Sequence, residues 1–200
     1  SVFGSNAIAV LISLRSKPIT DNFESGFSIS LGDDSHKAVK GFQNIKISNF
    51  LKLRYIFDYN YRDGFRKNIL KGMIDSNRKK ELFSRLKVEF NPNDQIKILG
   101  TYINANLDNR YDVWSPDNNE QFETYTDSLG EDSQKTQGFS LRSKIEINDD
   151  FNLLFISTGS NTKLVHAYDG DWANDAYWLD EHQFDPDSTG YHYSFYEKNK

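Results

Sequence analysis

Cysteine is absent from these 200 residues, which excludes disulfide bonds and thiolate metal sites. Apolar runs are short, and none approaches the roughly 18 residues that a transmembrane helix needs. This does not exclude a membrane protein, because the alternating strands of a β-barrel leave little hydropathy signal. Positive charge is not in excess either: the net charge of −5 argues against a nucleic-acid-binding protein.

Aliphatic residues are scarce, whereas aromatic residues are common. Hydrophobic residues make up 37% of the chain and aromatic residues 14%, with 11 Tyr and 15 Phe. This mixture is typical of strands with aromatic belts and less so of a helical bundle. The four prolines all lie outside the segments that read as strand interiors, as sheet pairing requires; they are Pro18, Pro92, Pro116 and Pro186.

The clearest periodicity lies in residues 51–62, where apolar and polar side chains alternate with only Ile56 out of place. A period of two indicates a strand. Twelve residues exceed the usual strand length of about 5–6 and suit a tilted strand that crosses a bilayer, which needs roughly 9–11. A long strand of a soluble β-sandwich would show the same pattern, so this segment alone leaves both possibilities open. The apolar face holds Leu51, Leu53, Tyr55, Phe57, Tyr59 and Tyr61.

Further segments alternate in the same way, and together they predict about eight antiparallel strands. Residues 151–158 are more uniformly apolar, and their two faces cannot be assigned. The expected strands cover residues 27–31, 39–47, 51–62, 82–90, 95–102, 139–147, 151–158 and 191–197.

Short and long connections alternate along the chain. The short ones are rich in Asn, Asp and Pro, which favour turns; they cover residues 48–49, 91–94 and 148–150. The long ones cover residues 62–80, 104–134 and 167–190, and only the connection at 31–37 departs from the pattern. The predicted fold is therefore all-β. It is an antiparallel up-and-down meander with long loops at one end, which is the layout of an outer-membrane barrel wall.

The two later long loops are acidic and aromatic. Residues 108–132 carry eight carboxylates and residues 169–187 carry seven. Aromatic side chains give a large contact area at low entropy cost, so they are candidates for a ligand-contacting surface at the barrel mouth. Packing of one loop aromatic against another is the alternative for each of them. The candidate ligand-binding residues are Tyr111, Trp114, Tyr168, Trp172, Tyr177 and Trp178.

No catalytic or cofactor site is expected, and the protein is predicted not to be an enzyme. Phosphate-loop, zinc-protease and nucleophile-elbow patterns are absent. The four histidines are scattered, so no metal site is expected from them. The runs at 169–171 and 185–187 offer oxygen ligands that suit calcium, but neither completes a calcium-loop signature, and a solvated turn is the favoured interpretation.

Basic side chains recur on the polar faces of the expected strands. In a wide barrel they would face the lumen, where they could guide an anionic ligand or bind neighbouring acids or a plug. These residues are Arg54, Arg62, Arg85, Lys87, Arg142 and Lys144.

Near its start the chain has Phe-Gly-Ser-Asn-Ala and an apolar stretch in residues 3–12, followed by Arg-Ser-Lys-Pro in residues 15–18. This order resembles the end of the plug domain in TonB-dependent outer-membrane receptors. That family commonly shows Gly-Arg-Asn-Ala, two small residues, an apolar strand and then Lys-Lys-Pro. Here residues 3–12 and 15–18 follow the same order. Ser5 stands in the place of the Arg, Ser13 replaces a frequent Asn, and one small residue is missing near Ala9.

Later segments resemble the same family in the same order. Residues 23–31 resemble its first barrel strand, and residues 59–65 resemble the end of its third strand with an Arg-Asp-Gly turn. Residues 112–114, 131–135 and 168–172 are similar to loop segments of one branch of the family.

The resemblance implies a barrel of about 22 strands with a plug inside it. Residues 1–18 would be the C-terminal end of the plug, and residues 19–200 the N-terminal portion of an incomplete barrel. The implied function is active uptake of a scarce solute across the cell outer membrane. The small-molecule ligand could be a ferric siderophore, a cobalamin, haem or an oligosaccharide, with the ferric siderophore as the default because it is common in the family. The implied partners are outer-membrane lipid and the TonB complex, which would be reached through plug residues that this sequence lacks.

Two alternatives remain open from the sequence. The first is a soluble, secreted β-sandwich that binds carbohydrate through its loop aromatics. It requires a second sheet over the apolar face of residues 51–62, whereas the barrel requires that face to form one outward band. The second is a porin-like barrel without a plug, against which the pattern in residues 3–18 speaks.

Overall fold

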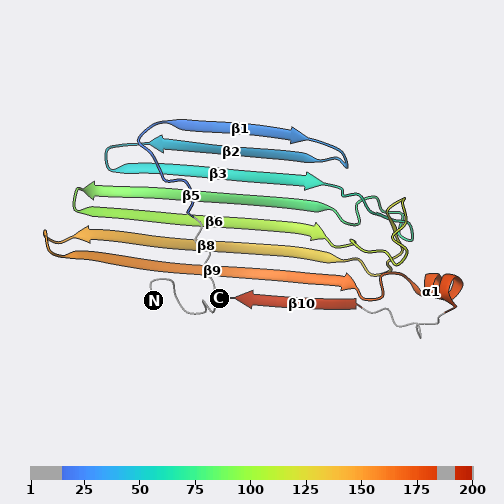
Figure 1. The fold of residues 1–200 in the computed structure, drawn as a ribbon. Helices are drawn as coiled ribbons and strands as arrows, with labels where there is room; N and C mark the ends of the chain where they lie inside the picture. Colours follow the sequence, from blue (N-terminus) through green and yellow to red (C-terminus); the bar gives the residue numbers. More distant parts are fainter. Residues whose placement is uncertain (1–14, 184–191, 200) are drawn as a thin grey trace.

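A computed structural model describes residues 15–183 and the backbone of residues 192–199. Most of the expected plug segment, residues 1–14, lies outside this range. Eight strands form one sheet in which each strand pairs antiparallel with the next along the chain, apart from two short strands that stand outside it (Figure 1). The strands are β1 (Glu24–Leu31), β2 (Lys37–Lys46), β3 (Leu51–Arg62), β5 (Lys79–Asn93), β6 (Ile96–Arg110), β8 (Glu131–Glu146), β9 (Asn152–Asp169) and β10 (His192–Asn199).

The predicted antiparallel meander is therefore confirmed. The strand expected at residues 51–62 coincides with β3. Within the described residues β1 and β10 are the two edges of an open sheet, so no closed barrel is present in this part of the chain.

The predicted loop at residues 104–134 was too long. β6 continues to Arg110 and β8 begins at Glu131, and these two ends pair with each other. Side chains on both faces are largely polar in these extensions, so the alternation disappears while the main-chain hydrogen bonds continue.

Three elements were not expected. Helix α1 (Asp175–His182) interrupts the last long loop, and the side chain of Asn174 caps it by accepting a hydrogen bond from the Tyr177 backbone N–H at 3.1 Å. Asn, Asp and Ser side chains favour such caps because they satisfy free N–H groups of the first turn. Strands β4 (Lys67–Asn68) and β7 (Glu123–Thr124) form a separate parallel pair between two loops.

The sheet has one polar and one apolar face, as its register shows. Side chains of directly opposed residues lie on the same face. On the polar face one row runs through Asn44, Arg54 and Lys87. On the apolar face one row runs from Ile29 to Lys163; its members are Ile29, Val39, Tyr59, Leu82, Asn106, Lys135 and Lys163.

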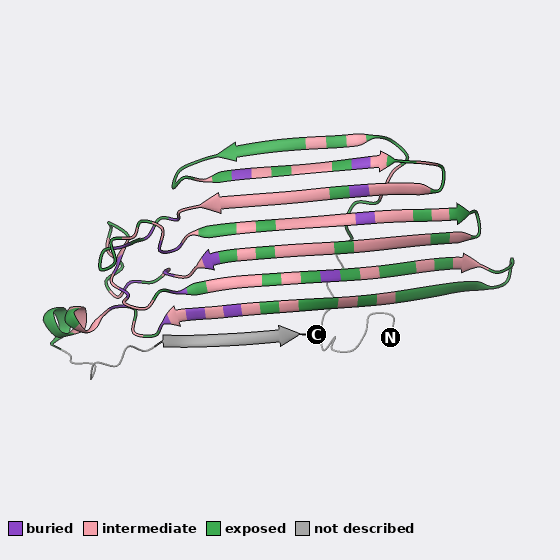
Figure 2. Ribbon diagram, turned by 180° about the vertical axis from the view of Figure 1, so that it is seen from behind, coloured by how far each residue is buried: buried purple, intermediate pink, exposed green. Residues whose placement is uncertain are grey.

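Large side chains on the apolar face are exposed rather than covered. Phe27 is 67% exposed, Phe139 57% and Phe155 52%. Long exposed stretches are visible on β1 and β9 (Figure 2). The buried apolar residues of the described chain are all small or medium in size, namely Ala38, Val165, Ala167 and Ala173. The described residues therefore form a single-layer sheet without a hydrophobic core.

The large apolar side chains form a band that crosses the strands diagonally. On β1 the margin of the band is at Leu31, two residues nearer to the long loops than the row of Ile29. On β8 the row passes through Lys135, and the margin of the band is at Phe139, four residues farther from the long loops. The margin thus shifts six residues over the five strand pairings to β8 and ten residues over the six pairings to Phe155 on β9, about 1.2–1.7 residues per strand. With about 3.3 Å per residue and about 4.8 Å between strands, this corresponds to a slope of about 40–50°.

Residues 15–23, the connecting segment, cross the polar face of the sheet (Figure 1). The Asn44 side chain on β2 donates to the Asn22 carbonyl at 2.7 Å. On β3, Lys52 pairs with Asp21 at 2.6 Å, and on β5 the Lys87 Nζ donates to the carbonyl of Lys17 at 2.8 Å. Hydrogen bonds and an ion pair therefore hold the connecting segment against three strands, β2, β3 and β5.

Among the described residues, no helix has the length and apolar character needed to cross a membrane.

Candidate functional site

The three long loops gather at one end of the sheet (Figure 1). We call residues 63–78, 111–130 and 170–183 the loop cluster. The parallel pair β4–β7 joins the first two loops, with the Lys67 N–H donating to the Phe122 carbonyl at 3.0 Å and the Ile69 N–H to the Thr124 carbonyl at 3.1 Å. The first two loops thus form one structured surface.

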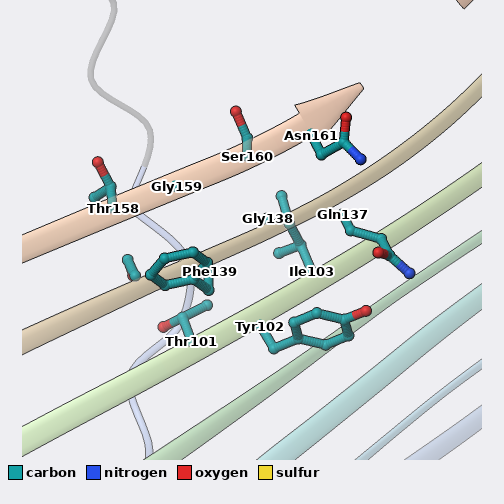
Figure 3. A pocket seen from close by; sticks show the side chains of 11 residues that line it. Thr101, Tyr102, Ile103, Gln137, Gly138, Phe139, Thr158, Gly159, Ser160 and Asn161 are labelled. Atoms are coloured by element: carbon teal, nitrogen blue, oxygen red, sulfur yellow. The ribbon is translucent and has the colours of Figure 1, made fainter. Parts of the chain in front are cut away.

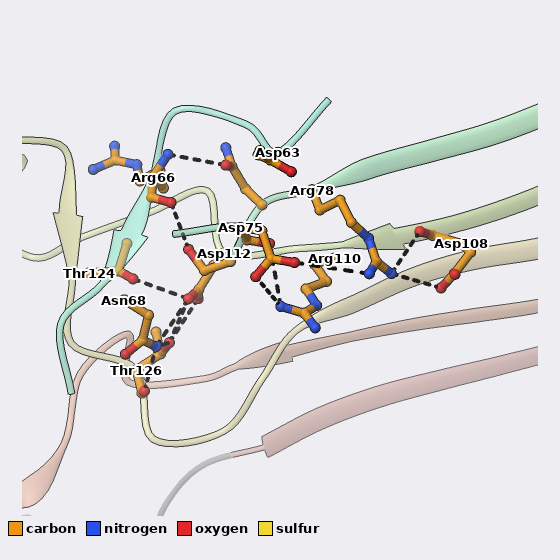
Figure 4. A network of polar contacts seen from close by, with 12 residues as sticks. Asp63, Arg66, Asn68, Asp75, Arg78, Asp108, Arg110, Asp112, Thr124 and Thr126 are labelled. Carbon is orange, nitrogen blue, oxygen red and sulfur yellow. Dashed lines mark hydrogen bonds and ion pairs between the residues drawn. The ribbon is translucent and has the colours of Figure 1, made fainter. Parts of the chain in front are cut away.

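A buried carboxylate, that of Asp112, holds the first two loops together (Figure 4). Its oxygens accept hydrogen bonds from the Thr124 hydroxyl at 3.1 Å, the Thr126 hydroxyl at 2.8 Å and the Asn68 amide at 3.3 Å. Burial raises the pKa of Asp112, while hydrogen bonds from Thr126, Asn68, Thr124 and Ser76 act in the opposite direction. Because protein donors surround this carboxylate, it stabilises the loops and is not open to a ligand.

Ion pairs attach the cluster to the ends of the strands. Arg110, the last residue of β6, bonds to Asp75 at 2.6 Å. Arg78, which precedes β5, bonds to Asp108 at 3.2 Å (Figure 4). These partly exposed pairs fix the direction in which the first loop leaves the sheet, although each contributes little to stability.

Two of the candidate ligand-binding aromatics, Tyr111 and Tyr168, pack together beside His166. The Tyr111 and His166 rings are 4.6 Å apart, and the two tyrosine rings are 6.3 Å apart. His166 also faces Asp132 at 3.4 Å. For these two tyrosines the structure favours the packing alternative, because their rings contact other aromatic rings.

Tyr177 and Trp178 lie on helix α1 and also pack within the cluster. Tyr177 stacks on Tyr125 with 4.6 Å between ring centroids, and Trp178 meets Tyr177 edge-on at 5.5 Å. His182 lies against Trp178 at 5.2 Å. Tyr125 was not among the predicted residues, although it fixes the helix to the preceding loop.

Trp114 and Trp172 form the remaining pair and are the best candidates for contact with a ligand. Their rings stack at 6.3 Å, yet Trp114 is 61% exposed and Trp172 44%. Trp172 has a positive φ of 64°, which is uncommon for a residue with a large side chain. The structure thus joins two loops through an exposed aromatic pair.

The Tyr125 stack is linked to a carboxylate that stays ionised to low pH. The Tyr125 hydroxyl donates to Asp117 at 2.7 Å. Burial tends to raise the pKa of Asp117, but hydrogen bonds from Asn119, Ser115 and Tyr125 outweigh it and lower the pKa to about 2. Burial and the Asp117 carboxylate together raise the pKa of Tyr125 to about 12.

These pKa shifts predict that the Tyr125–Tyr177 stack is stable at neutral pH and lost in acid. A carboxyl whose pKa is lower in the folded state stabilises the fold above its ordinary value of 3.8, and this contribution disappears as the pH falls from about 4 to 2. Near-ultraviolet circular dichroism should show a transition in this interval. Asp117→Asn should remove that transition, and an unchanged transition in the variant would contradict the assignment.

A shallow hollow of about 880 Å³ lies over the middle of β6, β8 and β9 (Figure 3). Its lining includes Gly138, Gly159 and the rings of Tyr102 and Phe139. None of its lining residues is charged. It also lies on the strands, away from the loop cluster.

Sequence reasoning missed the residues that hold the cluster together. Asp112 was only one of many loop acids, and neither Asn68 nor Thr124 stood out. Asn68 lies 44 residues and Thr124 lies 12 residues from Asp112 in the chain. No local pattern reveals such distant pairing.

Comparison with known proteins adds no relative to these observations: no protein-family model, no curated protein and no solved structure matches the chain.

Proposed function

We propose that the chain forms part of the wall of a TonB-dependent receptor in the cell outer membrane, where it takes part in active uptake of a scarce solute. The observation that carries this proposal is the exposed diagonal apolar band. Its slope of about 40–50° overlaps the tilt of about 35–45° that strands of outer-membrane barrels adopt. A band that is level in the bilayer must run diagonally across strands that are tilted by that angle.

The polar face supports the same proposal. A wide barrel has a wet lumen, where charged side chains are solvated or bind whatever fills it. Here Arg54 bonds to Glu24 at 3.3 Å, and Lys87 binds the connecting segment. In a receptor with a plug, the chain must pass from the lumen into the first barrel strand, and the connecting segment has such a course.

The soluble sandwich is the less favoured alternative. It needs a second sheet that covers the apolar face, and the described residues supply only the two-residue strands β4 and β7 outside the main sheet. Exposed apolar side chains over most of one face are unfavourable in water, because monomeric soluble proteins rarely expose large apolar patches. In a bilayer the same face is stabilised.

Within this proposal the loop cluster lies on the outer side and contacts the ligand through Trp114 and Trp172. A ferric siderophore is the first ligand to test, because the resembled family most often takes up such chelates. The TonB complex would act on the plug, driven by the proton gradient across the inner membrane.

Single-cysteine labelling tests the proposal cleanly, since the chain has no native cysteine. Spin labels at Ile29 and Phe155 should both show high collision rates with oxygen in lipid bilayers, because the diagonal band places them at similar depth. A label at Lys163 should be accessible to a water-soluble relaxation agent, although Lys163 and Ile29 lie in one hydrogen-bonded row.

Neighbouring positions provide the control. Labels at Ser28 and Ser140 lie on the polar face and should be accessible from water. A soluble sandwich would instead leave labels at Ile29 and Phe155 inaccessible to both agents, because a second sheet would bury them. That pattern would falsify the barrel proposal. So would equal bilayer depths for labels at Ile29 and Lys163, which lie in one hydrogen-bonded row.

A further inference from the structure

Asp169, the last residue of β9, has a buried carboxylate between two loops. Only 3% of the residue is exposed. Its Oδ2 accepts hydrogen bonds from the backbone N–H groups of Asp127 at 3.0 Å and Ser128 at 3.3 Å. The Asp127 N–H also approaches the carbonyl of Ala173 at 3.3 Å. The carboxylate is therefore held in a defined position.

The other oxygen, Oδ1, is buried and receives no hydrogen bond within the described chain. Buried polar atoms normally have partners, since leaving one unpaired is costly. An unpaired carboxylate oxygen in a fixed position is what a cation would satisfy. This atom is thus the observation that points to a ligand.

The surroundings of Asp169 are negative. The Asp171 carboxyl lies within hydrogen-bonding reach of Asp169, and the Asp127 carboxylate is close enough to act on it electrostatically. In the part of the chain that the structure describes, no lysine, arginine or histidine forms an ion pair with any of these three acids. The negative charge is concentrated without a protein cation to balance it.

We infer that Asp169 and Asp171 bind a divalent cation of the calcium type. Calcium takes 6–8 oxygen ligands and accepts main-chain carbonyls and water beside carboxylates. Residues 15–183 contain no group of three or more His, Asp or Glu side chains arranged around one point. The ion would therefore complete its shell with main-chain oxygens and water, and its dissociation constant should fall in the weak range of about 10⁻⁴–10⁻³ M.

A cation at this position would hold the second and third loops of the cluster, residues 111–130 and 170–183, together. It would tie the turn at residues 127–128 to residues 169–173, and Trp172 follows directly after Asp171. Because Trp172 stacks on Trp114, the cation would set the position of the exposed aromatic pair. This inference does not depend on the proposed transport function.

Terbium luminescence provides the test, because Tb³⁺ substitutes for Ca²⁺ and is excited by a nearby indole. Titration of Tb³⁺ into the protein should give saturable emission that Ca²⁺ suppresses. Asp169→Asn and Asp171→Asn should each weaken binding at least about tenfold, since calcium affinity depends on the number of charged ligands. Trp172→Phe should reduce the emission while calorimetry still detects Ca²⁺ binding.

Asp149→Asn is the matched control, since it removes one carboxylate from an exposed turn at the opposite end of the sheet. Its affinity for both ions should equal that of the original protein. Circular dichroism checks that each variant keeps its sheet. The Asp171→Asn variant also keeps the hydrogen bonds from the Asp127 and Ser128 backbone N–H groups to Asp169. The inference fails if neither ion binds at millimolar concentration, or if the two Asn variants bind as tightly as the control.

Discussion

Asp112→Ala is expected to open the loop cluster while leaving the sheet paired. The substitution removes the acceptor for the Thr124 and Thr126 hydroxyls and for one bond of the Asn68 amide, all of which are buried. Leaving such donors unsatisfied costs on the order of 3 kcal/mol in total. Amide hydrogen exchange should accelerate in residues 66–78 and 111–126 and remain unchanged in the centres of β5 and β6.

Asp112→Asn is the matched control for this prediction. Its side chain has the same shape and keeps one acceptor oxygen for the threonine hydroxyls, so we expect a cost of about 1 kcal/mol. It also removes a charge whose burial raises the pKa of Asp112. If the Ala and Asn variants exchange equally fast, or if the strands loosen together with the loops, the local role assigned to Asp112 is wrong.

Asn44→Ala is expected to detach the connecting segment from the polar face. The Asn44 side chain is fully buried. It accepts from the Thr20 N–H at 3.2 Å and donates to the carbonyls of Thr20 at 3.0 Å and Asn22 at 2.7 Å. Loss of these bonds should cost on the order of 2–3 kcal/mol. Hydrogen exchange in residues 18–23 should accelerate strongly.

Gln43→Ala is the comparison for this variant, because Gln43 precedes Asn44 on β2 but lies on the opposite face. It should leave exchange in residues 18–23 unchanged. Slow exchange in the Asn44→Ala variant would show that the Lys52–Asp21 ion pair and the hydrogen bond from Lys87 to the Lys17 carbonyl hold the connecting segment without Asn44.

The strands could be predicted where one face is apolar and the other polar. Residues 51–62 satisfy this condition at every position except Ile56 and were predicted with the correct bounds. The condition fails at Asn104 and Asn106 and at Lys135 and Gln137, where polar side chains occupy the apolar face beyond the band. Pairing continues there through main-chain hydrogen bonds, which carry no sequence signal.

The loop cluster was much harder to predict. Composition placed the candidate aromatic residues in the long loops, which is wrong for Tyr168 because β9 extends to Asp169. Composition also could not show which rings meet. Tyr111 contacts His166 because β6, β8 and β9 are paired in a particular register, and that register is a property of the whole sheet. The exposed pair of Trp114 and Trp172 depends in the same way on how two distant loops fold over the strand ends.

The parallel pair β4–β7 has a consequence for the order of folding. Every strand of the large sheet pairs with its neighbour along the chain, so each hairpin can form soon after its two strands are available, at a small loop-closure cost. By contrast, β4 and β7 meet only when the intervening hairpin of β5 and β6 has brought Asn68 and Thr124 together. We therefore expect the sheet to assemble progressively and the loop cluster to close last.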